Sequence, residues 1–348
     1  MTDGYEFRPV GRRGLRITAE ELVEWSAPEG GAIPLVAQPR AGGVNLVNWA
    51  EGRRATLEER LAQHGALLFR GFDVDSVEKF ERFIAATSGG ALAYHERSSP
   101  RSPVAGHIYT STDHPPGQSI FLHNEQSYNL VFPSKIYFFC LTPAARGGET
   151  PIADMRKVYA ALRPDVRRRF AEQGYVYARN FGDGFGLPWR EAFQTEDRAE
   201  VEEYCRRHRI EFEWKSGGRL RTRQTRPAIA RHPRMGEAVW FNHATFFHVS
   251  TLDAAIRERL LAGLGEDELP NNTFYGDGAP IEPEVAEHLR QSYLREKTVF
   301  TWRQYDILLL DNMLVSHGRE PFEGPRLVTA GMADPRRWED VRLPSGEE

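Results

Sequence analysis

The strand-forming segments of this 348-residue chain fall into an early and a late group, with predicted helices between them. Runs rich in β-branched and aromatic residues occupy 119–123 and 135–141 in the early group. The late group comprises 298–302, 307–310 and 327–332. An alternating βαβ chain would spread its strands along the sequence. The observed grouping therefore favours a mainly β fold with inserted helices, built on a mostly antiparallel double sheet.

Helices are expected where apolar residues recur at helical spacing beside residues that start or end helices. Ser76 is a good cap, Pro283 suits a first helical turn, and Gly174 suits a helix end. These signals predict helices at 76–87, 155–162, 164–173, 253–263 and 283–295, with another around 201–208. The other strand signals predict a buried strand at 66–69, a hairpin of 211–214 with 219–222, and a strand at 238–241.

Composition and charge narrow the classes of function. Hydrophobic residues make up 40% of the chain and charged residues 27%, the balance of a soluble globular protein with a sizeable core. The formal net charge of −4 provides no strong field for nucleic acid, and no apolar stretch reaches membrane-spanning length. Cys140 and Cys205 are too few for a disulfide framework. We therefore expect one cytoplasmic domain over residues 1–348, with a small-molecule partner and neither nucleic acid nor membrane.

One group of residues could hold a metal ion. His123 and Glu125 close the predicted strand at 119–123, and side chains two positions apart on an extended chain point the same way. His317 follows the predicted strand at 307–310 and could supply a third ligand. Two histidines and a carboxylate on one face of an ion suit non-heme iron(II), because they leave positions open for a co-substrate and dioxygen.

Spacing alone leaves other interpretations of these residues open. The chain has 11 histidines, so a His-x-Glu arises easily by chance, and the same three ligands would also suit a zinc hydrolase. Most of the other histidines are expected to be ordinary surface or core residues: His64, His95, His107, His114, His208, His232 and His288. The sequence does not decide between the two classes for His243 and His248.

Several ordered segments resemble one known family. They are 64–72, 109–112, 123–128, 147–154, 239–243, 272–278 and 309–319. Together they resemble the TauD/TfdA-like superfamily of iron(II)/2-oxoglutarate-dependent dioxygenases, and most nearly its SyrP-like group, which includes amino-acid hydroxylases of peptide-antibiotic pathways. The resemblance implies a double-stranded β-helix (jelly-roll, cupin-like) core over about 60–335, with a helical insert over about 154–235. It also implies that His123, Glu125 and His317 bind Fe(II) and form the catalytic centre.

The resemblance also indicates where 2-oxoglutarate binds. The far carboxylate of this co-substrate needs a cation, and the planar fork of arginine suits it. Arg326, just before the last predicted strand, is the first choice, and Thr150 matches the threonine whose hydroxyl meets the same carboxylate in relatives. Some relatives carry the arginine slightly later, but 328–331 contains none. Arg319 is a minor alternative.

The implied reaction converts 2-oxoglutarate and O2 to succinate and CO2 while an unactivated C–H bond of the substrate is hydroxylated. Related halogenases lack the carboxylate ligand, so Glu125 argues against halogenation. Desaturation, epoxidation or cyclisation would use the same ligands. A catalytically inactive binding protein is disfavoured by the intact ligand set, and a zinc hydrolase is disfavoured by Arg326 and Thr150.

The resemblance suggests an amino acid as substrate, either free or loaded on a peptidyl carrier protein, in antibiotic biosynthesis. Such a substrate needs its carboxylate and its amine held so that one carbon faces the iron. Arg97 precedes the early strands and is the candidate for a carboxyl or carbonyl group. Asn129 and Asn242 are the candidates for orienting the polar end of the substrate.

Overall fold

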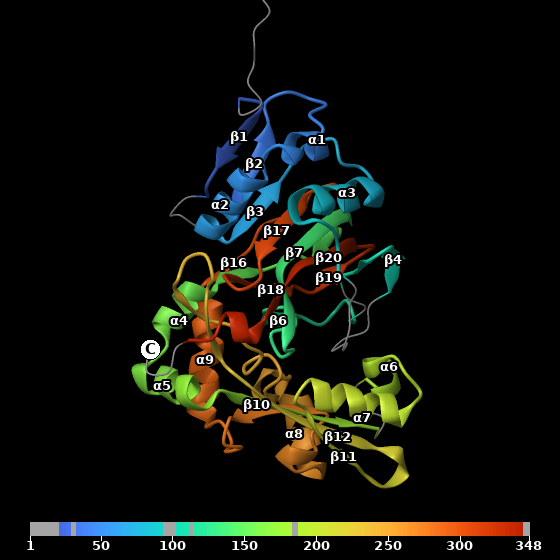
Figure 1. Cartoon of the computed structure of the whole chain (residues 1–348), viewed down its shortest axis with the longest axis vertical. Coiled ribbons are helices and arrows are strands. Elements are labelled where there is room, and N and C mark those ends of the chain that lie inside the picture. The colour runs from blue at the N-terminus through green and yellow to red at the C-terminus, as the bar shows by residue number, and fades with distance from the viewer. Residues whose placement is uncertain (1–20, 29–32, 93–101, 112–113, 183–186, 344–348) are drawn as a thin grey trace, which may run out of the picture.

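The computed structural model describes residues 21–28, 33–92, 102–111, 114–182 and 187–343. The long axis of the molecule runs from the N-terminal strands and helices, through two central sheets, to a smaller sheet at the opposite end (Figure 1). Sheet and helix thus occur together in a sheet-rich mixed fold. Among the described helices, none is both long and apolar enough to cross a membrane.

The largest sheet has eight strands and forms the backbone of the fold. In spatial order these are β1 (Val23–Ser26), β2 (Leu35–Pro39), β3 (Ala66–Phe69), β17 (Ile307–Asp311), β7 (Val131–Thr142), β20 (Leu327–Arg337), β5 (Ile108–Thr110) and β4 (Pro103–Ala105). Every pairing is antiparallel except that of β2 with β3. The late strands β17 and β20 flank the early strand β7, and the sheet is mostly antiparallel, as the sequence predicts.

A second sheet lies against the first and carries the candidate site. Its order is β16 (Lys297–Thr298), β9 (Ile152–Asp154), β18 (Val315–Arg319) and β6 (Ile120–His123), all antiparallel. A short pair, β8 (Arg146–Gly147) and β19 (Phe322–Glu323), extends beside it. The rings of Phe138 on β7 and His317 on β18 are 4.9 Å apart, which shows that the two sheets face each other.

A third sheet, three of whose four strands come from the 154–235 region, lies at the far end of the molecule (Figure 1). It is ordered β11 (Glu211–Trp214), β12 (Leu220–Arg226), β10 (Tyr175–Phe181) and β15 (Asn271–Tyr275), again antiparallel (Figure 1). A separate pair joins β13 (Ile229–Arg231) to β14 (Ala238–Trp240). β11 and β12 are the predicted hairpin, with Gly217 and Gly218 both at positive φ in its turn.

The helices cover the sheets on several sides. They are α1 (Leu46–Glu51), α2 (Arg54–His64), α3 (Val77–Ser88), α4 (Met155–Ala161), α5 (Pro164–Gln173), α6 (Trp189–Phe193), α7 (Arg198–Arg207), α8 (Ala254–Gly263) and α9 (Pro283–Arg295). The predicted starts are confirmed where a cap is visible: Ser76 accepts a hydrogen bond from the Lys79 backbone N–H, and Pro283 lies in the first turn of α9. α1, α2 and α6 have no counterpart among the helices predicted from the sequence.

The predicted strand at 298–302 is wrong for most of its length. Only Lys297 and Thr298 pair, with β9, and the chain then leaves the sheet. The reason is a set of side-chain bonds: Arg70 donates to the backbone carbonyl of Thr301 at 2.8 Å and pairs with Asp306. Val299 and Thr301 are exposed, whereas Phe300 packs partly buried against the core between the sheets and Trp302 is buried in that core.

Candidate metal centre

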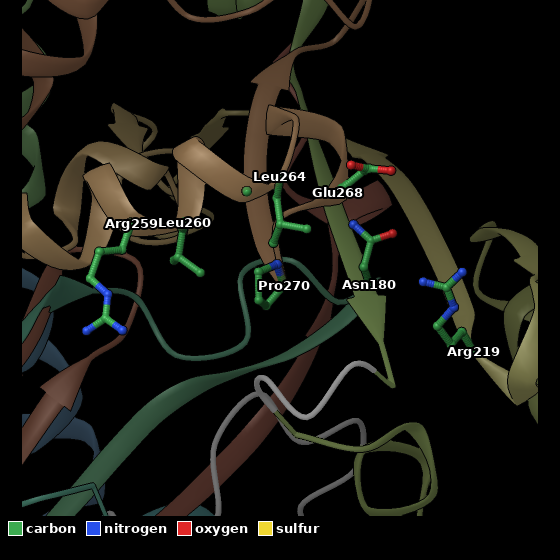
Figure 2. A pocket seen from close by; sticks show the side chains of 8 residues that line it. Asn180, Arg219, Arg259, Leu260, Leu264, Glu268 and Pro270 are labelled. Atoms are coloured by element: carbon green, nitrogen blue, oxygen red, sulfur yellow. The ribbon is translucent and has the colours of Figure 1, made fainter.

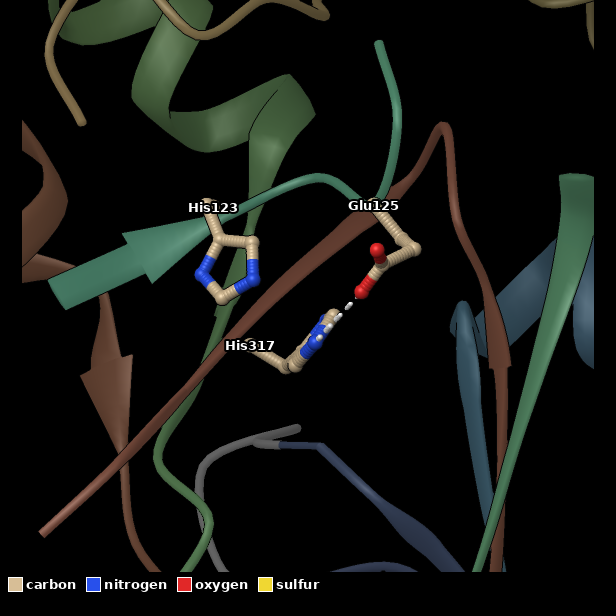
Figure 3. A group of neighbouring side chains, drawn as sticks. All are labelled: His123, Glu125 and His317. Carbon is tan, nitrogen blue, oxygen red and sulfur yellow. Dashed lines mark ion pairs between the residues drawn. The ribbon is translucent and has the colours of Figure 1, made fainter. Parts of the chain in front are cut away.

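The three predicted ligands come together between the two central sheets. His123 ends β6, Glu125 follows it in a turn, and His317 lies in the middle of β18 directly opposite His123 in the strand register. One ligand atom from each residue lies within 4.8 Å of the others, and His317 Nε2 is 3.8 Å from Glu125 Oε2 (Figure 3). The side chains of these residues therefore converge on one point, as the sequence predicts.

The orientation of His123 is fixed by its backbone neighbour. Its Nδ1 lies 2.9 Å from the carbonyl oxygen of Phe121, so Nδ1 carries the proton and Nε2 is left as the ligand atom. The ring of Phe246 lies 4.4 Å from that of His123, and the two histidine rings are 4.5 Å apart. The ligands thus have an apolar aromatic wall on one side.

Asn312 attaches the Glu125 turn to the hairpin that carries His317. Its Oδ1 accepts from the Glu125 backbone N–H at 2.8 Å, and its Nδ2 donates to the Glu125 carbonyl at 2.9 Å. The Nδ2 group of Asn124 donates a hydrogen bond of 2.6 Å to the backbone carbonyl of Asn312. Asn312 is fully buried, so these bonds are shielded from competing water. One side chain therefore holds two ligand-bearing segments in register.

The donor set fits a divalent transition metal. Glu125 is 3% exposed and His317 is 4% exposed, so the carboxylate is removed from bulk water at a point where two imidazole nitrogens meet. Burying an anion is costly unless a cation accompanies it. Three protein ligands on one side would leave coordination positions open for other molecules, which is the arrangement of non-heme iron(II) oxygenases.

Arg326 lies in a half-buried position before β20. Its Nε donates to the Gly148 carbonyl at 2.9 Å, and the Phe322 ring lies 5.6 Å from its guanidinium carbon. Burial, together with the nearby Arg319 charge, lowers the pKa of Arg326 to about 10. Within the described residues no carboxylate forms an ion pair with it. A desolvated guanidinium of this kind is suited to an anionic ligand.

Arg319 does not share this property. Its guanidinium donates to the backbone carbonyls of His114, Pro115 and Gln118 at 2.6–2.8 Å. Through these bonds the Arg319 side chain connects β18 to the 114–118 segment. The minor alternative, an anion site at Arg319, is therefore not supported by the geometry.

The three residues predicted to contact the substrate have different environments in the structure. Arg97 lies outside the described residues. Asn129 is 6% exposed, and its Oδ1 has no hydrogen-bond partner within the described residues. The Asn129 side chain lines a cavity of about 520 Å³, and Gln126, the residue after the ligand Glu125, lines the same cavity. Asn242 donates to the Ala228 carbonyl at 2.8 Å and accepts from the Ala244 N–H at 2.9 Å. The Asn242 amide thus braces a turn, so it is not available to orient a substrate.

His243, undecided from the sequence, lies near the centre. Its Nδ1 is 2.6 Å from Ser127 Oγ, and its ring centroid is 5.8 Å from that of His123. Burial holds the pKa of His243 well below its usual value, so the ring is neutral.

Trp302 is a second residue that the sequence did not reveal, because its partner Thr150 is 152 positions away in the chain.

A different cavity, of about 400 Å³, lies beside α8 and the edge of the insert sheet. Figure 2 shows its lining, which includes Asn180, Arg219, Leu260, Leu264 and Glu268. None of the candidate ligands or 2-oxoglutarate residues lines it. This cavity is therefore separate from the candidate metal centre.

Known proteins resemble this chain in sequence and in fold. Residues 31–332 match the family described as "Taurine catabolism dioxygenase TauD, TfdA family". The dapdiamide synthesis protein DdaC of Enterobacter agglomerans is 43% identical over 279 residues, which cover 80% of this chain and 85% of that protein. The clavaminate synthase-like protein At3g21360 of Arabidopsis thaliana is 30% identical, over 79% and 83% of the two chains.

A solved structure shows a similar fold at low sequence identity. PvcB, described as an Fe, alpha-ketoglutarate dependent oxygenase from an isonitrile synthetic pathway, aligns with a TM-score of 0.54 and 16% identity. The alignment covers 98% of this chain and 100% of PvcB. The likeness supports the arrangement of sheets and helices over almost the whole length of this chain.

Proposed function

Because the chain belongs to the TauD, TfdA family of dioxygenases, we propose that it is an iron(II)- and 2-oxoglutarate-dependent oxygenase that hydroxylates an unactivated C–H bond of an amino acid. The observation that carries this proposal is the convergence of His123, Glu125 and His317 on one point between two sheets. The family membership separates this function from a zinc hydrolase with the same ligands. The ligand set itself separates it from an inactive binding protein.

The roles of the ligands follow from their chemistry. His123 and His317 would bind iron(II) through Nε2, and Glu125 would supply the anionic ligand that balances part of its charge. When bound, iron(II) with 2-oxoglutarate and dioxygen supplies the oxidising chemistry, yielding succinate, CO2 and the oxidised product. The chain's own contribution is to orient the ligands, exclude water and present one C–H bond of the substrate.

We assign the far carboxylate of 2-oxoglutarate to Arg326 and Thr150. Arg326 supplies a desolvated cation without a carboxylate partner among the described residues, and Thr150 supplies a buried hydroxyl. Both belong to one local structure, since Arg326 donates to the carbonyl of Gly148, two residues before Thr150. β9, which follows Thr150, pairs with β18 so that Ile152 lies opposite His317. The anion site is thus joined directly to the metal centre.

The two facing sheets support a double-stranded β-helix, as expected for this family, as the core of the chain. The eight-stranded sheet provides one wall through β7, and the sheet of β16, β9, β18 and β6 provides the other. The ligands lie on the second wall and point toward the first. We propose this jelly-roll arrangement as the core of the chain, with the residue 154–235 region as an insert upon it.

The substrate is proposed as an amino acid of specialised metabolism, free or on a peptidyl carrier protein. Support comes from the 43% identity to a protein named for dapdiamide synthesis. Further support comes from Asn129, which lines the cavity beside the Glu125 turn and whose buried Oδ1 accepts no hydrogen bond within the described residues. Desaturation, epoxidation or cyclisation of the same substrate would use the same centre.

The test combines spectroscopy with product analysis. Anaerobic addition of iron(II) and 2-oxoglutarate is expected to give a weak visible charge-transfer band, and exposure to air is expected to give succinate. Mass spectrometry over free and carrier-bound amino acids would identify products 16 mass units heavier than the substrate. A protein that binds zinc, gives no such band and forms no succinate would contradict the proposed function.

A further inference from the structure

The hydroxyl of Thr150 accepts a hydrogen bond from another buried side chain. The indole Nε1 of Trp302 lies 3.0 Å from Thr150 Oγ1, and both side chains are buried. An indole N–H can only donate, so Thr150 Oγ1 is the acceptor in this bond. The hydroxyl hydrogen of Thr150 must therefore point elsewhere, and no acceptor for it occurs among the described residues.

Trp302 is itself held firmly by its chain neighbours. Arg70, at the end of β3, donates to the Thr301 carbonyl at 2.8 Å and to Asp306 Oδ2 at 2.6 Å. Asp306 Oδ2 also accepts from the Arg303 backbone N–H at 2.8 Å. The Asp306 side chain is almost fully buried, which keeps this network dry. The segment between β16 and β17 is thus fixed on both sides of the tryptophan.

The position of Thr150 makes its free hydroxyl hydrogen relevant to anion binding. Gly148, two residues earlier, accepts a hydrogen bond from Arg326. Ile152, two residues later, lies opposite the ligand His317. Thr150 therefore lies in the short segment that runs from the half-buried Arg326 to the metal centre.

We propose that Trp302 is a positioning residue for 2-oxoglutarate, because it occupies the acceptor side of Thr150 and so directs the Thr150 O–H as a donor to the far carboxylate. The inference rests on the proposed function and extends it to a residue outside the anion site. Trp302 itself does not touch the co-substrate. It acts by removing the alternative hydroxyl orientation, in which Thr150 would donate its O–H to a neighbour and turn a lone pair toward the anion.

The test measures 2-oxoglutarate affinity by anaerobic titration of the iron(II) protein, with the visible charge-transfer band as the signal. Trp302→Phe keeps an aromatic ring in the core but removes the N–H donor, and is expected to weaken 2-oxoglutarate binding about fivefold. Thr150→Val removes the hydroxyl and is expected to weaken it about tenfold or more, since the lost bond is to a charged group. In the double variant, Trp302→Phe should add almost nothing to the effect of Thr150→Val.

Trp189→Phe is the matched control. Trp189 is also buried and donates its indole N–H to a backbone carbonyl, that of Gly218, but it lies in the insert. This variant should bind 2-oxoglutarate as the wild type does. Trp302→His, which keeps a ring N–H, should retain more affinity than Trp302→Phe, and it serves as the second variant if the phenylalanine form does not fold.

The possible results distinguish the role of Trp302 from the proposed function. A wild type that does not bind 2-oxoglutarate at all would overturn the proposed function. If Trp302→Phe bound 2-oxoglutarate with wild-type affinity, only the role of Trp302 would be overturned. The same would follow if Trp302→Phe and Trp189→Phe lost equal amounts of 2-oxoglutarate affinity. Additive losses in the Trp302/Thr150 double variant would also overturn it, because the tryptophan would then act independently of the hydroxyl.

Discussion

Glu125 is the anionic ligand of the candidate centre, and its backbone is held on both sides by Asn312. Glu125→Ala is expected to abolish hydroxylation and to weaken iron(II) binding by at least about a hundredfold, because a ligand and its charge are both lost. His317→Ala should behave in the same way. Iron content after gel filtration and succinate formation are the measurements, and full activity without added formate or halide would disprove the ligand assignment.

The control for these ligand variants should be an exposed histidine. His107 is exposed, so His107→Ala is expected to change neither iron content nor succinate formation. His232 is less suitable, because its Nε2 lies 3.0 Å from Asp311 Oδ2, and Asp311 accepts from the Met313 and Leu314 backbone N–H groups ahead of β18. Its loss would disturb the hairpin that carries His317.

Arg326 is expected to determine the affinity for 2-oxoglutarate. Removing one partner of a buried charged pair costs on the order of 3–5 kcal/mol, so Arg326→Ala should raise the 2-oxoglutarate requirement about a hundredfold or more. The requirement for the prime substrate should change much less. Steady-state kinetics with each reactant varied in turn makes the comparison. Unchanged 2-oxoglutarate affinity would place the anchor elsewhere.

His248 is expected to make the protein less stable in acid. Burial, with a smaller effect of the Arg257 charge, lowers the pKa of His248 from 6.5 to about 4. The unfolded chain therefore takes up a proton first, so this contribution to stability is complete above pH 6.5 and is lost as the pH falls toward 4. In His248→Gln, the free energy of unfolding should fall less between pH 7 and pH 4.5, by roughly 2 kcal/mol. Urea denaturation at the two pH values measures this, and equal falls in both proteins would contradict it.

Roles that depend on local sequence were predictable, whereas side-chain contacts with distant partners were not, and His317 was assigned through the family resemblance. His123 and Glu125 are two apart on a strand, so their common direction follows from strand geometry. Trp302 and Asn312 act through partners more than 150 positions away. Asn242 was predicted to contact the substrate, but its side-chain amide bonds to the Ala228 carbonyl and the Ala244 N–H. No sequence pattern predicts these two backbone partners.

At the scale of elements, the approach of β18 to β6 depends on Gly318. A Cβ added there would lie 2.5 Å from the Ile120 carbonyl oxygen and 3.3 Å from a Pro151 side-chain carbon. Gly318→Ala is therefore expected to push β6 away from β18 and to separate His123 from His317. Iron(II) affinity should fall about tenfold or more. Metal titration and thermal melting are the measurements.

Gly263 provides the matched substitution for this test. It is the last residue of α8, its φ is not positive, and an added Cβ would meet nothing within 4 Å. Gly263→Ala should leave iron binding unchanged and could only add stability, by up to about 1 kcal/mol. If Gly318→Ala bound iron as well as Gly263→Ala does, close packing of the two strands would not be what brings the ligands together.

Element prediction succeeded for helices with one apolar face and for strands with an uninterrupted apolar run. Pro164–Gln173 and Pro283–Arg295 have the predicted bounds, because each has one apolar face and a proline in its first turn. β3 and β17 were predicted because their runs are almost wholly apolar, whereas β10 and β15 were missed because arginine and asparagine residues interrupt theirs. β18 was missed because serine, histidine, glycine and arginine make up four of its five residues, and only pairing with β6 and β9 forms the strand.

On the scale of the whole molecule, the insert and the metal-binding core share one hydrophobic cluster. Tyr128, three residues after Glu125, packs its ring 5.6 Å from that of Tyr177 on β10. Arg226 on β12 also donates to the Tyr128 carbonyl at 2.7 Å. We propose that the chain is a single domain over residues 1–348, with the insert and the core unfolding together.

The two cysteines of the chain allow this proposal to be tested. Cys140 is buried on β7 in the core between the sheets, and Cys205 is buried on α7 in a separate cluster of the insert. Burial also raises the pKa of the Cys140 thiol to about 12, so a thiol-reactive reagent should label it only after unfolding. In the variants Cys140→Ala and Cys205→Ala, the remaining cysteine reports on one part of the molecule at a time.

Both cysteines are expected to become reactive over the same range of urea concentration, coincident with the loss of circular dichroism. Coincidence is expected because Tyr128 links the metal-binding turn to β10 and β12, and neither part can lose its packing without exposing that cluster. Arg226→Met removes the bond to Tyr128, so in this variant Cys205 should become reactive at a lower urea concentration than Cys140. If Cys205 already reacts at lower urea in the chain with Arg226 intact, the insert unfolds independently. The single-domain proposal would then be wrong.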